Sequence, residues 1–148
     1  MRPHHGHLLQ SAEVRSALRR AWEDSSPGLT GGHEEGGFFV RGVLGDLTVV
    51  RWPVGGKDFA LLPPHEDCRI GDRDIVASFH THPNSGGDYL QEPGETEKRA
   101  VRDDPDLKGS VYVGEFVVSE SRTYLITPMG DVLNLGDTRT LLFAEQGG

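Results

Sequence analysis

The apolar residues near the start of the chain recur with a helical period. Val14, Leu18 and Trp22 lie four residues apart, and arginines occupy the other side of the same stretch. This spacing predicts an amphipathic helix over residues 8–22 that packs on a flat surface. The sequence Ser-Ser-Pro-Gly at 25–28 is typical of a helix end.

The middle and C-terminal parts of the chain alternate between short apolar runs and turn sequences. Gly45-Asp46 separates two β-rich runs and predicts a hairpin of strands 38–44 and 47–52. A helix is expected over 95–103, because Pro93-Gly94 precedes an acidic first turn. Further strands are expected at 75–79, 111–118, 123–127 and 132–135, with a closing helix at 137–144. Six phenylalanines are expected in the core: Phe38, Phe39, Phe59, Phe79, Phe116 and Phe143.

This order of elements predicts an α/β fold rather than a strict alternation of strands and helices. The 148 residues suit one domain, here placed at 8–148 after a flexible N-terminus at 1–7. His4, His5 and His7 in that terminus are expected to be solvated, with at most a capacity for stray metal.

Composition excludes several classes of function. Fifteen basic and 23 acidic residues give a net charge of −8. A nucleic-acid-binding domain normally carries a positively charged surface, so the sign of the charge is opposite to that class. No apolar run approaches the roughly 20 residues that cross a bilayer, and no secretory signal is visible. Cys68 is the only cysteine, so no internal disulfide can form. A cytoplasmic protein without nucleic-acid or membrane partners is expected.

The most informative segment is His80-Thr81-His82-Pro83. Side chains alternate along a strand, so His80 and His82 project from one face, roughly 7 Å apart at Cα. Pro83 ends the strand, which places both imidazoles at its exposed end. Two imidazoles in this arrangement can bind one metal ion.

A catalytic zinc ion needs a third protein ligand and, for its water, a base. Several acidic residues downstream of His82 can supply the ligand, among them Asp88, Glu92, Glu95 and Glu97. Upstream, Glu34 and Glu35 precede the strand at 38–44 and are candidates for the base. In an extended chain these two neighbours point in opposite directions.

These residues together resemble the JAMM motif of the JAB/MPN metalloprotease family, in its prokaryotic JAB-like branch. The family pattern is Glu-x-x-Gly before an apolar strand, then His-x-His-Pro, then Pro-Ser-x-x-Asp. Here Glu34-Glu35-Gly36-Gly37 leads into the first strand, residues 80–83 match in full, and Pro93-Gly94-Glu95-Thr96-Glu97 takes the last place. The order and approximate spacing agree across residues 34–97.

The resemblance implies a fold, a cofactor and an activity. It implies the MPN/JAB-like (cytidine-deaminase-like) fold, a mostly antiparallel mixed sheet flanked by helices. It implies Zn²⁺ held by His80, His82 and Glu97, with Glu34 as the catalytic base. The implied reaction is hydrolysis of a peptide or isopeptide bond, with a peptide or the tail of a ubiquitin-like protein as the substrate.

The sequence departs from the family pattern at three points. Gly94 stands where the family has the serine that stabilises the tetrahedral intermediate, and loss of one such donor can cost about 10²–10³ in rate. Glu97 replaces the family aspartate, and the loop before Pro93 is a few residues longer than usual, which keeps Asp88 as an alternative third ligand. These departures leave a second hypothesis open, an MPN-type scaffold without catalytic activity.

Overall fold

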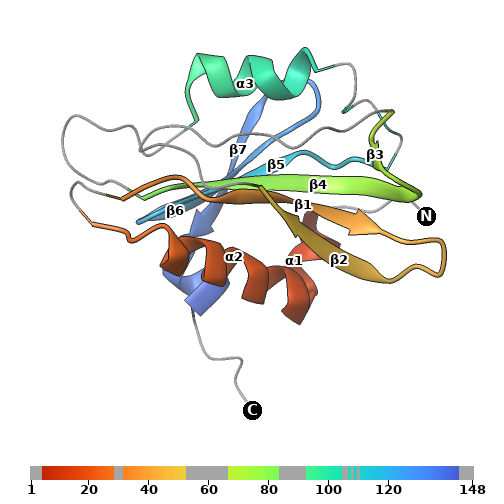
Figure 1. Ribbon diagram of the computed structural model, residues 1–148. Helices are drawn as coiled ribbons and strands as arrows, with labels where there is room; N and C mark the ends of the chain where they lie inside the picture. The colour runs from red at the N-terminus through yellow and green to blue at the C-terminus, as the bar shows by residue number, and fades with distance from the viewer. Residues whose placement is uncertain are drawn as a thin grey trace.

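Seven strands form one open sheet with helices on both faces, as the computed structural model shows (Figure 1). The structure describes residues 5–28, 32–52, 67–83, 93–104, 107, 109 and 111–143, apart from the side chains of His5, His7 and residues 95–97. The strand order is β2-β1-β4-β5-β6-β7, with β3 paired to β4. The β4–β5 pair is parallel and the other pairs are antiparallel. The expected α/β class with a mostly antiparallel sheet is confirmed.

The N-terminal helix is divided in two. Helix α1 spans His5–Gln10 and α2 spans Ala12–Asp24, where one helix over 8–22 was expected. The reason is Ser11, whose side chain accepts a hydrogen bond from the Val14 amide and caps α2. Helix α1 begins inside residues 1–7, where a flexible terminus was expected.

The first two strands form the expected hairpin with a wider turn. Strand β1 is Gly36–Arg41 and β2 is Leu47–Arg51. The Gly42 amide donates to the Asp46 carbonyl, and Gly45 has a φ of 86° that suits glycine. The turn therefore begins before residue 44, and Val43 and Leu44 at its tip are exposed.

The other strands also differ in part from expectation. Strand β4 is Arg73–His82 and is preceded by a two-residue strand β3, Arg69–Ile70, which was not expected. Strand β5 is Glu115–Ser119, so the expected strand over 111–118 was wrong in its first half, where Gly114 has a φ of 127°. Strands β6 and β7 are Arg122–Ile126 and Val132–Asp137. The closing helix is a π-helical segment, Arg139–Phe143.

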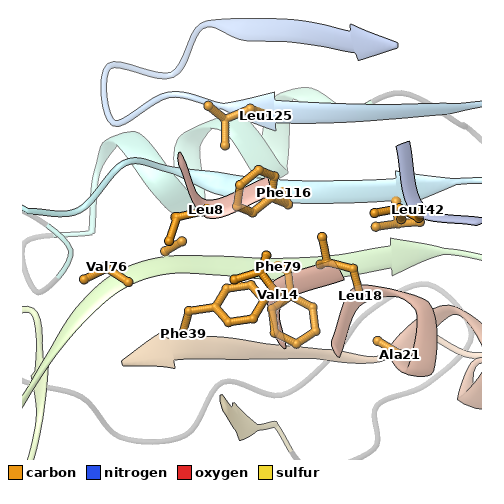
Figure 2. Packing of buried hydrophobic residues seen from close by; sticks show 12 residues of the cluster. Leu8, Val14, Leu18, Ala21, Phe39, Val76, Phe79, Phe116, Leu125 and Leu142 are labelled. Atoms are coloured by element: carbon orange, nitrogen blue, oxygen red, sulfur yellow. The ribbon is translucent and has the colours of Figure 1, made fainter. Parts of the chain in front are cut away.

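One face of the sheet is covered by α1 and α2 (Figure 1). Figure 2 shows Phe39, Phe79 and Phe116 of three strands gathered around Val14 and Leu18 of α2. The Phe39 and Phe79 rings lie 4.9 Å apart between centroids, a favourable aromatic contact. The four phenylalanines of β1, β4 and β5 are buried as expected, whereas Phe143 is 39% exposed and Phe59 lies outside the described residues.

The opposite face is covered by α3, Glu95–Arg102 (Figure 1). Val101 of this helix packs in a second core with Phe38 of β1 and Val117 of β5. Phe38 lies opposite Ser78 in the β1–β4 register, so Ser78, His80 and His82 share the face that α3 covers. The chain from β4 through α3 to the parallel strand β5 thus carries the helix over the face of the histidines.

Within the described part of the chain, every helix is too short or too polar to cross a bilayer.

Candidate metal centre

The last residues of β4 place two imidazoles side by side. His80 and His82 are both buried, and their Nε2 atoms lie 3.2 Å apart. Strand β4 ends at His82, and the Pro83 carbonyl accepts a hydrogen bond from the Gly28 amide. The expected same-face pair at a strand end is therefore present.

The strand register brings Glu34 to the same place. Gly36 of β1 lies opposite His80, and the Thr81 amide donates to the Glu35 carbonyl, so the pairing continues past the end of β1. Extending that register by two residues places Glu34 opposite His82. Ligand atoms of Glu34, His80 and His82 all lie within 4.8 Å of one another, and all three residues are buried. These residues form a cluster that can hold a metal ion.

Glu35 is held away from this cluster. Its carboxylate pairs with Arg51 of β2 and accepts a hydrogen bond from His33 Nε2 at 2.6 Å. Its amide donates to Thr81 Oγ1 at 3.0 Å. The two glutamates thus point in opposite directions, as expected for an extended chain, and His33 has a specific partner in Glu35.

Gly36 allows an aromatic ring to lie close to the cluster. A Cβ atom at this position would overlap the Trp52 indole and the Phe79 carbonyl. The glycine after Glu34 and Glu35 therefore has a packing role, because only hydrogen leaves room for Trp52 directly beside the strand position opposite His80.

The donor set fits a tetrahedral metal ion. Two imidazole nitrogens at 2.0–2.1 Å from one zinc ion are separated by about 3.3 Å if the angle is tetrahedral. The observed separation of 3.2 Å agrees with this value. Two imidazole nitrogens at this distance can share a proton or bind one metal ion.

Sequence reasoning missed a fourth buried residue of the centre, Glu115 at the start of β5. Its Oε2 atom lies 2.7 Å from His80 Nδ1, and its Oε1 atom accepts a hydrogen bond from Ser78 Oγ at 2.8 Å. The Ser78 hydroxyl also lies 2.7 Å from the Tyr112 hydroxyl. An acid directly before the apolar run 116–118 was the available signal, but only the β4–β5 pairing reveals its partner.

Burial is the main reason why the pKa of Tyr112 is raised well above 10.0, and the nearby charge of Glu115 adds to the effect. The folded protein therefore retains the phenolic proton more firmly than the unfolded chain. This contribution to stability is complete below pH about 10 and is lost as the pH rises toward the folded-state pKa.

We expect Tyr112→Phe to flatten the alkaline part of the stability profile. Below pH about 10 the variant should be less stable by about 1 kcal/mol, the usual contribution of one hydrogen bond. Above that pH the difference should shrink, because the wild type alone pays for ionising this buried phenol. Urea unfolding between pH 8 and 11 measures both, with Tyr124→Phe on β6 as the control. Parallel profiles for wild type and Tyr112→Phe would contradict the raised pKa.

The remaining predicted residues are placed only in part. Glu97 lies in the first turn of α3, which covers the face of the histidines, but its side chain is outside the described residues. Asp88 and Glu92 lie outside them entirely. The Gly94 carbonyl accepts a hydrogen bond from the Lys98 amide at the start of α3. The third ligand therefore stays a prediction.

A pocket of about 720 Å³ lies elsewhere, between the C-terminal end of α2 and the π-helical segment. Its lining includes Trp22, Arg139 and Phe143 but none of the three residues of the cluster. It opens on the face covered by α2, whereas the histidines lie on the face covered by α3. It is therefore separate from the metal centre.

The fold and the site together define a mixed α/β protein with a buried cluster of two histidines and one glutamate. No family model matches the chain, and neither the curated proteins nor the solved structures include a significant match. The function is therefore argued from the site itself.

Proposed function

We propose that the chain is a zinc-dependent hydrolase of the JAMM type that cleaves a peptide or isopeptide bond. The observation that carries this proposal is the buried cluster of Glu34, His80 and His82, with imidazole nitrogens at the separation that tetrahedral zinc requires. Nitrogen and carboxylate ligands suit zinc, although they do not exclude other divalent transition metals. The mixed α/β sheet of the structure is a broader class than the MPN/JAB-like fold. That particular fold is part of the same proposal.

Each residue has a distinct part in the proposed reaction. His80 and His82 hold the metal, together with a carboxylate for which Glu97 is the first candidate and Asp88 the second. When bound, zinc acidifies a water molecule and polarises the scissile carbonyl. Glu34 accepts the proton of the attacking water and delivers it to the leaving amine. Burial of Glu34 keeps its carboxylate close to both imidazoles and limits competition from bulk water.

The proposed substrate is an extended peptide, with the tail of a ubiquitin-like protein as the particular case. The cluster lies at the end of β4, and β2, an outermost strand among the described residues, ends nearby at Arg51, next to Trp52. An extended chain can add to such a strand edge through backbone hydrogen bonds. A cytoplasmic location and the absence of nucleic-acid partners remain expectations from composition.

Gly94 and Glu97 favour a second candidate, a scaffold domain that lacks a working metal site and does not hydrolyse substrate. The missing serine hydroxyl removes one donor for the tetrahedral intermediate, worth about 10²–10³ in rate. Such a domain would keep the histidines but bind no zinc, with Gly94 and Glu97 as marks of a lost site. Metal content and hydrolysis must therefore be measured separately.

Removal of the metal tests the proposal. We expect about one zinc ion per chain by elemental analysis, and hydrolysis of an isopeptide-linked or peptide-linked ubiquitin-like tail. Dialysis against a chelator should abolish hydrolysis, and stoichiometric Zn²⁺ should restore it. Zinc binding without hydrolysis of any tail substrate would contradict the proposed activity. A chain that binds no metal after reconstitution would overturn the hydrolase and support the scaffold.

A further inference from the structure

Glu115 is a carboxylate at a buried position, where a charge is energetically unfavourable. It is the first residue of β5, lies 8% exposed, and is followed by the buried residues Phe116, Val117 and Val118. Removing a carboxylate from water costs several kcal/mol unless its oxygens are bonded. A structural reason for retaining this acid must therefore lie in its contacts.

Both oxygens of Glu115 are directed to β4. The parallel register places Glu115 opposite Ser78, and His80 lies two residues farther along the same face. Oε1 accepts the Ser78 hydroxyl proton, and Oε2 lies 2.7 Å from His80 Nδ1. Glu115 therefore bridges two side chains of the strand that carries the histidine pair, and only one of them, His80, belongs to the metal cluster.

The direction of this hydrogen-bond chain is set at its far end. Tyr112 is protonated near neutral pH, because burial raises the pKa of its phenol, so it can donate to Ser78 Oγ. Ser78 can then donate to Glu115 Oε1, which leaves Oε2 as an acceptor for the proton on His80 Nδ1. With Nδ1 protonated, a neutral His80 presents the lone pair of Nε2 toward His82 and Glu34.

We propose that Glu115 is a positioning residue that fixes the Nδ1-protonated tautomer of His80 and aims its Nε2 lone pair at the metal. The tautomer is a property of the metal-free protein, and the gain in metal affinity rests on the proposed function. A carboxylate that accepts a hydrogen bond from the second nitrogen of a ligating imidazole fixes the orientation of the ring and increases the ring's basicity. Loss of such a partner weakens metal binding by about 10–100-fold. Ser78 and Tyr112 hold the carboxylate in turn.

Two variants separate the charge of Glu115 from its hydrogen bond. Glu115→Gln keeps an oxygen that can accept from His80 Nδ1 but removes the charge, so the tautomer should persist while zinc affinity falls about 10-fold. Glu115→Val suits a buried strand but has no acceptor, so the Nδ1-protonated tautomer should be lost and zinc affinity should fall about 100-fold. Glu120→Gln, an exposed acid just after β5, is the matched control.

The readouts are the ¹⁵N chemical shifts of the His80 ring in metal-free protein and zinc affinity by competition with a chromophoric chelator. Circular dichroism and thermal unfolding show which variants fold. If Glu115→Val does not fold, two measurements decide the outcome. These are the zinc affinity of Glu115→Gln and the tautomer of His80 in the wild type. Protonation of His80 at Nε2 in the metal-free wild type would overturn the inference, as would zinc binding by Glu115→Gln within twofold of wild type. Failure of the wild type to bind zinc, with Nδ1 of His80 protonated, would overturn the affinity part of the inference together with the proposed function, and would support only the tautomer part.

Discussion

The double variant His80→Ala/His82→Ala is expected to lose its bound metal and its hydrolytic activity together. The two imidazoles supply two of the expected three protein ligands, and their Nε2 atoms lie 3.2 Å apart. Removing both should weaken zinc binding by far more than the 10–100-fold that is typical for loss of a residue that only hydrogen-bonds to a ligand. Zinc per chain, measured after gel filtration, should fall from about one to near zero, and hydrolysis of a tail substrate should fall to background.

The controls for this variant address stray metal and folding. His4→Ala/His5→Ala/His7→Ala removes the same residue type from the N-terminus and should keep one tightly bound zinc ion. His80→Ala leaves Glu115 without one of its hydrogen-bond partners, at a cost of about 1–3 kcal/mol, so thermal unfolding must accompany the metal analysis. The single variant His82→Ala does not disturb Glu115 and should lose metal in a folded chain. Retention of stoichiometric zinc by a folded double variant would contradict the proposed centre.

Glu34→Gln is expected to separate metal binding from catalysis. If Glu34 is the base, the amide cannot accept the proton of the attacking water, and kcat/KM should fall by about 10²–10⁴. Zinc should remain at about one per chain, because the two histidines and the third ligand are unchanged. Steady-state hydrolysis and elemental analysis of the same preparation test both parts.

The same variant distinguishes two roles that the geometry allows for Glu34. Its carboxylate lies within 4.8 Å of both imidazoles, close enough to act through a water molecule or, after a small movement, on the metal itself. Zinc affinity reduced more than about 100-fold would identify Glu34 as a ligand and would contradict its role as base. Glu120→Gln is the control here as well, since it removes one acidic charge outside the cluster.

Local sequence patterns were sufficient for those parts of the fold that depend on neighbouring residues. The spacing of Val14, Leu18 and Trp22 predicted the helix that packs on the sheet, and the turn at Gly45-Asp46 predicted the hairpin. The boundaries were less accurate where a single contact decides them. The Ser11 cap divides the first helix, and Gly114 delays the start of β5.

The sequence also determined that the two histidines of the candidate centre lie side by side. A period of two places His80 and His82 on one face of any strand, and Pro83 ends that strand. It further predicted that Glu34 and Glu35 diverge. Glu34 lies 46 residues before His80, however, and their proximity depends on the antiparallel register between β1 and β4. No local signal fixes that register, because it follows from the packing of both sheet faces.

Only the tertiary structure reveals the contacts of Glu115. In the sequence it is an acid at the head of an apolar run, which is equally consistent with an exposed strand end. The parallel pairing of β4 with β5, made possible by the crossover through α3, places its carboxylate against His80 and Ser78. Glu115 and His80 are 35 residues apart, so their hydrogen bond depends on the fold and not on local sequence preference. It forms only because the fold brings donor and acceptor together.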